Sequence, residues 1–207
     1  MQKNLAPTKG NLMMAKNTLR LSKQGYEMLD KKRNILIREM MLLIEEAKEV
    51  EEKIELTFAE AYKALESANV IMGVSKVQEL AHSAVPEDSV DIDLRSVMGV
   101  EIPVVHAKNP DLRPVYSFYG TSSALDEASI KFGEVKLMTV RLTEIENSVY
   151  RLAMNIKKTQ KRANALENIT IPLYESLTKE IQSSLEEKER EEHTRLKIIK
   201  HTKEKEK

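Results

Sequence analysis

Two hydrophobic stripes, one toward each end of the chain, constrain the fold of this sequence most strongly. In both stripes apolar residues recur at intervals of three and four, with two intervals of seven in the second, which is the spacing along the contact edge of a packed helix. The first stripe consists of Leu36, Met40, Leu43, Ala47, Val50, Ile54, Phe58, Ala61, Leu65, Ala68 and Met72. The second consists of Phe132, Val135, Met138, Leu142, Ile145, Val149, Leu152, Ile156, Ala163, Leu166, Leu173 and Leu177. We therefore predict a mainly α fold in which two long helices form an antiparallel coiled coil.

The composition favours an elongated helical protein over a compact globular one. Only 4% of the 207 residues are aromatic and 32% are charged, whereas a globular core of this size uses more large rings. The chain has no Cys, which excludes disulfides and cysteine-based chemistry and fits a reducing compartment. No apolar run is long enough to span a membrane, and no signal peptide begins the sequence. We expect a cytoplasmic protein that can dock onto a membrane-bound complex from outside the bilayer.

The stripes divide the chain into three predicted domains. Residues 1–72 form an N-terminal helix that begins near Thr8, a residue that can cap it. Residues 122–207 form a C-terminal helix, and Pro172 should disturb it because proline lacks a backbone donor. If Met72 lies beside Phe132, the antiparallel register places Gly25 near Lys179 and Pro172 near the basic residues around Lys32.

The middle domain, residues 73–121, has a different periodicity. Apolar residues alternate with charged ones from Val90 to Leu94, and alternation resumes from Val100 to Val104 after Met98-Gly99. This pattern predicts a short β-hairpin. A lone hairpin is marginally stable in water, so we expect it to pack against the coiled coil. We expect it to modulate activity through Val90, Ile92, Leu94, Met98, Gly99, Val100, Ile102 and Val104.

Positive charge concentrates at both ends of a chain whose net charge is zero. Residues 1–38 carry nine basic residues against two acidic ones, and residues 193–207 carry six against two. Because an antiparallel pair brings both termini to one end, that end should contact an acidic protein surface or nucleic acid.

The sequence contains no recognisable catalytic motif. The six glycines are scattered and form no phosphate-binding loop, and the four histidines lack metal-ligand spacing. Carboxylates such as those between Glu45 and Glu52 form a dense run, which on a long helix is typical of the solvated face. We therefore expect a protein that is not an enzyme by itself and that holds no cofactor and no metal.

Motifs across nearly the whole chain resemble the D subunit of the V-type and A-type rotary ATPases. In the N-terminal helix they are Pro7, Thr8, Lys9, Leu12, Leu19, Gly25, Leu29 and Lys31 to Arg33. In the hairpin they are Ser96 to Val100, Ile102 and Pro103. In the C-terminal helix they are Thr159, Lys161, Arg162, Asn164 to Glu167, Ile171, Pro172, Leu185 to Glu192 and Arg195 to Lys197.

The resemblance implies a central rotor stalk without an active site of its own. Its two terminal helices would enter a ring of A and B subunits. Its lower part would bind the F subunit and rest on the funnel subunit above the membrane ring. By turning, it would couple ATP turnover to the transport of protons or sodium ions. The basic residues that we expect to contact the A/B ring are Lys9, Arg20, Lys23, Lys32, Arg33, Lys161 and Arg162.

Two other functions are compatible with paired helices and a basic end. A holdase chaperone resembling prefoldin also joins two coiled-coil helices through a β-hairpin, but it would expose apolar residues at its free helix tips, where this chain has Lys, Arg and Glu. A coiled coil that binds nucleic acid would show steeply salt-dependent affinity. Co-expression with ring subunits distinguishes the three, because only a rotor stalk forms a stoichiometric complex with them.

Overall fold

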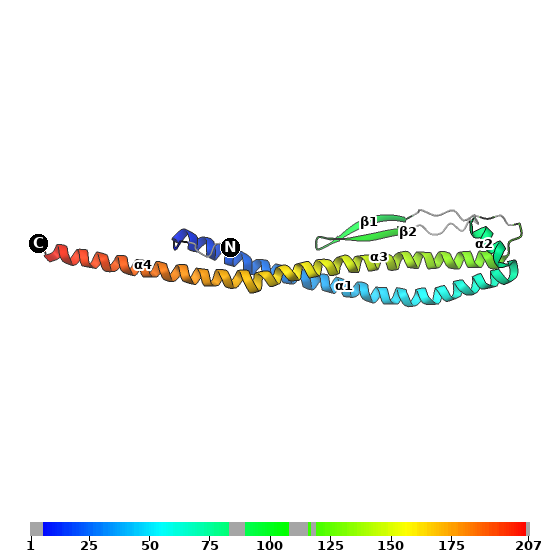
Figure 1. Ribbon diagram of the computed structural model, residues 1–207, viewed down its shortest axis with the longest axis horizontal. Coiled ribbons are helices and arrows are strands. Elements are labelled where there is room, and N and C mark those ends of the chain that lie inside the picture. The colour runs from blue at the N-terminus through cyan, green and yellow to red at the C-terminus, as the bar shows by residue number, and fades with distance from the viewer. Residues whose placement is uncertain (1–5, 83–89, 108–115, 117–118, 206–207) are drawn as a thin grey trace. The chain divides into compact units, whose positions relative to one another are not determined.

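The computed structural model describes residues 6–82, 90–107, 116 and 119–205. Its elements are α1 (Lys9–Met72), α2 (Val74–His82), β1 (Val90–Val97), β2 (Val100–Ala107), α3 (Ser123–Ala165), the π-helical turn η1 (Leu166–Thr170) and α4 (Ile171–Lys205) (Figure 1). Long helices with a small antiparallel hairpin confirm the predicted mainly α fold class. Part of the predicted middle domain, at 83–89, 108–115 and 117–118, lies outside the described residues.

The ends of α1 follow from its flanking residues. The Thr8 hydroxyl accepts a hydrogen bond from the Asn11 backbone N–H at 3.2 Å, which confirms the predicted N-terminal cap. At the other end Gly73 has φ 85°, a left-handed conformation that glycine adopts without steric cost. The Gly73 N–H donates to the Asn69 carbonyl at 2.9 Å. The helix therefore stops at Met72 because the next residue closes its last turn.

The chain forms two compact units. Unit 1 comprises Met1–Asn34 and Lys157–Lys207, and unit 2 comprises Ile35–Ile156. In each unit a part of α1 runs antiparallel to the second half of the chain, as contacts between distant residues show. In unit 2, for example, Lys131 of α3 bonds to Glu60 of α1 at 2.9 Å.

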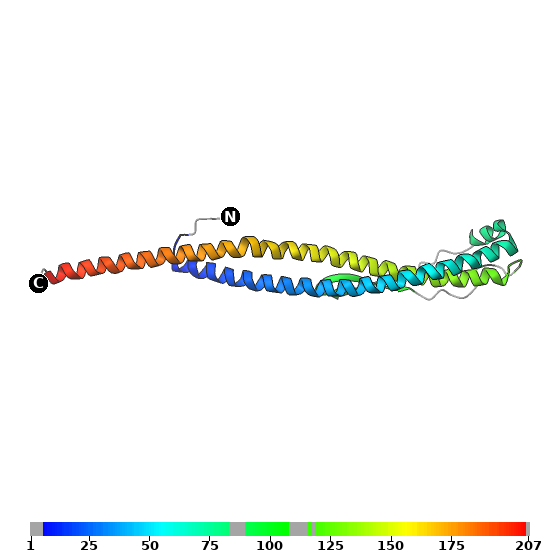
Figure 2. The same ribbon diagram turned by 90° about the horizontal axis from the view of Figure 1, so that it is seen from below.

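The core of unit 2 lies where the hairpin meets the helix pair. Leu36 of α1 and Leu152 of α3 are both 0% exposed and form one cluster with Val100 and Ile102 of β2. Figures 1 and 2 show the hairpin alongside the helices of this unit. The hairpin thus leans on the coiled coil, as its marginal stability in isolation requires.

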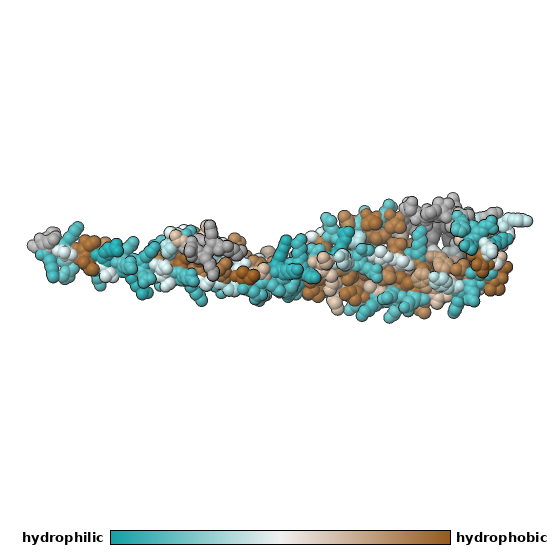
Figure 3. Space-filling model, in the orientation of Figure 1, coloured by the Kyte–Doolittle hydropathy of each residue, from teal (hydrophilic) through white to brown (hydrophobic). Residues whose placement is uncertain are grey.

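The two apolar sets of the hairpin face opposite ways. Val97 pairs with Val100, and side chains alternate between faces along each strand, so Val100 and Ile102 point toward the helices. Ile92 and Leu94 lie on the other face and are 65% and 60% exposed. Figure 3 shows a brown area in the region of the hairpin. Among the described residues, none covers this apolar surface of unit 2.

The hairpin turn at Met98-Gly99 is the tight two-residue type, since Val97 pairs with Val100. Met98 has φ 50° and Gly99 has φ 76°, so both central residues adopt the left-handed region. Glycine tolerates this conformation, but methionine does not favour it.

Met98→Asn should stabilise the hairpin by about 0.5–1 kcal/mol, because asparagine adopts the left-handed region at lower cost than methionine. Amide hydrogen exchange in β1 and β2 should slow accordingly. Ser96→Asn, two residues away within β1, is the matched control and should give no such protection. Equal exchange rates in Met98→Asn and the native chain would contradict this account.

The predicted register of the helix pair is wrong. Tyr62, not Met72, contacts Phe132, with ring centroids 5.6 Å apart. Gly25 faces Leu166 instead of Lys179. The reason is that the contact edge of α3 extends beyond Phe132 to Ala128, which is 2% exposed but too small to mark the stripe in the sequence.

The disturbance predicted at Pro172 takes the form of the π-helical turn. In η1 the Ile171 N–H donates to the Leu166 carbonyl five residues back, so the turn holds one residue more than an α-helical turn. Pro172 then occupies the second position of α4, where a missing N–H is tolerated. The helix thus accommodates the proline by widening the turn before it.

Candidate partner-binding surface

The seven basic residues expected to bind a partner all lie in unit 1, but three of them have partners within the chain. Lys9 pairs with Glu189 at 2.9 Å, and Lys23 pairs with Glu175 at 2.6 Å. Both pairs join α1 to α4. Arg33 pairs with Asp30 at 2.5 Å.

The ion pairs shift the pKa of their members in the expected directions. Glu189 raises the pKa of Lys9, chiefly through a side-chain hydrogen bond. Lys23 lowers the pKa of Glu175 for the same reason. These groups are exposed, so each pair adds little to stability. Their charges are nevertheless largely neutralised within the chain, which makes Lys9 and Lys23 weaker sources of attraction for a partner.

Three of the four remaining cations lie at one level of the helix pair together with three further lysines, and we call these six residues the basic cluster. Among the described residues, no residue of the basic cluster forms an ion pair. Neither does the exposed Arg20, which lies nearer the N-terminus of α1. The hydrogen bond between Arg33 of α1 and Gln160 of α3 shows that the helix segments around these two residues lie at the same level along the helix pair. The basic cluster consists of Lys31, Lys32, Lys157, Lys158, Lys161 and Arg162. All but the half-buried Lys32 are exposed.

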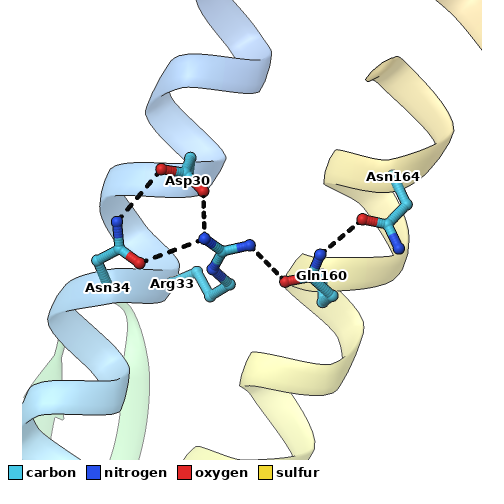
Figure 4. Close-up of polar contacts among 5 residues, drawn as sticks. All are labelled: Asp30, Arg33, Asn34, Gln160 and Asn164. Atoms are coloured by element: carbon cyan, nitrogen blue, oxygen red, sulfur yellow. Dashed lines mark hydrogen bonds and ion pairs between the residues drawn. The ribbon is translucent and has the colours of Figure 1, made fainter. Parts of the chain in front are cut away.

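Arg33 occupies a different environment. Its guanidinium reaches across from α1 and donates to the Gln160 side chain of α3 at 2.6 Å (Figure 4). Its side chain is only 26% exposed. Sequence reasoning grouped Arg33 with the partner-facing cations and missed Gln160. The available signal was the interruption of the second stripe by Gln160, between Ile156 and Ala163.

The hairpin residues expected to modulate activity divide between two environments. Val100 and Ile102 are buried against the helices, where they hold the hairpin in place. Met98 at the turn is 46% exposed, and Ile92 and Leu94 are 65% and 60% exposed. Only the exposed group is available to another molecule.

Neither a metal site nor a membrane span is found in the described part of the chain. No group of three or more His, Asp or Glu side chains there could hold a metal ion. Within the same residues, no helix is both long and apolar enough to cross a bilayer.

Comparisons with known proteins agree with this architecture along nearly the whole chain. The family model that describes the D subunit of ATP synthase matches residues 11–201. The D subunit of the V-type ATP synthase of Thermotoga neapolitana is 46% identical over 95% of this chain and 97% of its own. The D subunits of the A-type ATP synthases of Methanobrevibacter smithii and Thermococcus kodakarensis are 39% and 36% identical, over 96% and 95% of this chain and 87% and 94% of their own. The chain therefore belongs to the family of ATP synthase D subunits.

Proposed function

We propose that this protein is the central rotor shaft of a V/A-type ATPase. It would turn inside a ring of A and B subunits and couple ATP hydrolysis or synthesis there to proton or sodium transport through the membrane rotor. The protein would lie on the cytoplasmic side of the membrane as a peripheral, non-catalytic component. The observation that carries the proposal is an antiparallel helix pair with a basic cluster in unit 1, in a chain that belongs to the D-subunit family.

A shaft of this kind has to resist twisting and to present an uneven surface to its surroundings. The helix pair supports the first property, since residues such as Leu36 and Leu152 are completely buried where α1, α3 and the hairpin meet. The basic cluster supports the second property, because it concentrates positive charge at one level of the helix pair. An off-axis charge lets a rotating protein interact differently with otherwise equivalent neighbours.

Other surfaces of the chain would serve other partners of the complex. The F subunit would bind the shaft, and the funnel subunit would connect it to the membrane ring. The exposed hairpin residues Ile92, Leu94 and Met98 would modulate activity through contacts that form only in the assembled complex.

The double charge reversal Lys161→Glu/Arg162→Glu tests the role of the basic cluster. Because attraction between complementary surfaces would be replaced by repulsion, binding to a complex of A and B subunits should weaken at least about tenfold at ~0.1 M salt. The loss should shrink at high salt, which screens exposed charges. Binding can be measured by titration, and helix content by circular dichroism.

The control is Lys48→Glu/Lys53→Glu, which makes the same change in charge at two exposed lysines of unit 2. It should bind the ring nearly as the native chain does. Native assembly and native coupled ATPase activity in the Lys161→Glu/Arg162→Glu variant would refute the proposed role of the cluster.

A further inference from the structure

A layer of polar side chains crosses the helix pair of unit 1 just before the π-helical turn. The Arg33 guanidinium forms its centre, with Asp30 on α1 and Gln160 on α3 as partners at 2.5 and 2.6 Å (Figure 4). The Gln160 amide in turn donates to the Asn164 side chain at 2.6 Å. Asn34 completes the layer by donating to Asp30 at 3.2 Å. The layer thus ties α1 to the last α-helical turns of α3.

The π-helical turn begins directly after this layer. Asn164 is followed by Ala165, whose carbonyl accepts the Thr170 hydroxyl at 3.3 Å, and by η1 itself. On the other side of η1, Pro172 has no N–H to offer to a further wide turn. The extra residue of η1 is therefore confined between the polar layer and the proline.

A π-helical turn can shift along a helix, because it is an insertion of one residue into α-helical spacing. If η1 moved toward the N-terminus, the residues it passed would rotate by about 100° around the helix axis, while those beyond its original place would keep their direction. Such a shift past Gln160 would turn that side chain away from Arg33. It would also turn Ala163, which is 1% exposed, out of the interface with α1.

Apolar packing before η1 offers little resistance to such a shift. The fully buried residues described in the segment that would turn are small or hydroxyl-bearing, namely Thr159 and Ala163, whereas larger apolar side chains in η1 and beyond it, such as Leu166 and Leu173, are half-buried. Small side chains form shallow contacts, so they only weakly determine which side of a helix packs against its partner. The directional hydrogen bond between Arg33 and Gln160 supplies the specificity that the packing lacks.

We propose that Arg33 and Gln160 are positioning residues that stop the π-helical turn from moving toward the N-terminus and so fix the direction in which Lys161 and Arg162 point. Arg33 then acts within the helix pair and not as a contact to a partner. The consequence for partner binding rests on the proposed rotor function, because Lys161 and Arg162 belong to the basic cluster. The claim that Arg33 and Gln160 hold the π-helical turn in place does not rest on that function.

Thiol labelling of the full chain tests the claim directly, because the native sequence has no Cys. Ala163→Cys should react slowly with a maleimide in an otherwise native chain. In the background Arg33→Met/Gln160→Leu it should react at least about tenfold faster, since the residue spends time outside the interface. Thr178→Cys, which is 8% exposed in the native structure and lies beyond η1, should remain protected in both backgrounds.

The contrast between the two positions separates a shifted turn from a general loosening of the helix pair. Equal acceleration at 163 and 178, or unchanged protection at 163, would overturn the proposal. Gln160→Glu retains a partner for Arg33 and should restore slow labelling. Arg20→Met removes an exposed arginine by the same chemical change and should have no effect. If Arg33→Met/Gln160→Leu loses helix content, the single change Gln160→Leu replaces it as the background, because it keeps the pair of Arg33 with Asp30. The labelling rates at positions 163 and 178 are then judged by the same criteria.

Discussion

Leu152→Ala should lower the free energy of unfolding by about 2–5 kcal/mol, the range for removing a buried leucine. The loss is large because Leu152 is 0% exposed and belongs to the cluster that joins α1, α3 and β2. The hairpin packs on the helix pair through this cluster, so its amides should also exchange faster. Urea denaturation followed by circular dichroism measures the first effect, and amide hydrogen exchange measures the second.

Met154→Ala is the matched control for this experiment. Met154 lies two residues away on the same helix but is 52% exposed, so its truncation should cost no more than about 0.5 kcal/mol. A loss below about 1 kcal/mol for Leu152→Ala would mean that the cluster collapses around the cavity. The hairpin would then depend less on α3 than its burial indicates.

Deleting Ile169 should destabilise unit 1 without turning the far part of α4. The deletion removes the extra residue of η1, so a regular α-helix replaces the π-helical turn and the residues beyond it keep their direction. Thr178 and Ile181 would stay in the interface, and Glu175 would still reach Lys23. We expect the free energy of unfolding to fall by about 3 kcal/mol in urea denaturation, because Pro172 in a regular helix clashes with the preceding turn. Zero-length carbodiimide coupling should still join Lys23 to Glu175.

Two variants complete the test. Adding Pro172→Ala to the deletion removes the proline clash, so stability should recover while the coupling of Lys23 to Glu175 is retained. Deleting Lys197 is the control, because every described residue from 186 to 205 is exposed. Loss of the coupling in the Ile169 deletion would show that the π-helical turn does not absorb the extra residue.

The fold was predictable because its main determinants are local. The two stripes, the capping hydroxyl of Thr8 and the Met98-Gly99 turn each act over a few residues, and each has a characteristic sequence. The register was not predictable in this way. It depends on Ala128, a small residue whose burial becomes evident only when the facing helix is in place.

The role of Arg33 shows the same limit at the candidate site. Its main partner across the pair, Gln160, lies 127 positions away in the sequence. A cation seen in sequence alone is assigned to solvent or to another molecule, since nothing local indicates a distant amide. The same applies to Lys9 and Lys23, whose carboxylate partners are on α4.

The cluster of Leu36, Val100, Ile102 and Leu152 also has a consequence for biosynthesis. A chain is made from its N-terminus, so Leu36 and the hairpin leave the ribosome well before Leu152 does. Until Leu152 follows Ile102 out of the ribosome, the apolar edge of α1 and the inner face of the hairpin have no partner from α3. Exposed apolar surface in such intermediates promotes aggregation. Nascent or prematurely terminated chains of this protein are therefore natural clients for chaperones, whereas the completed chain covers the same surface by itself.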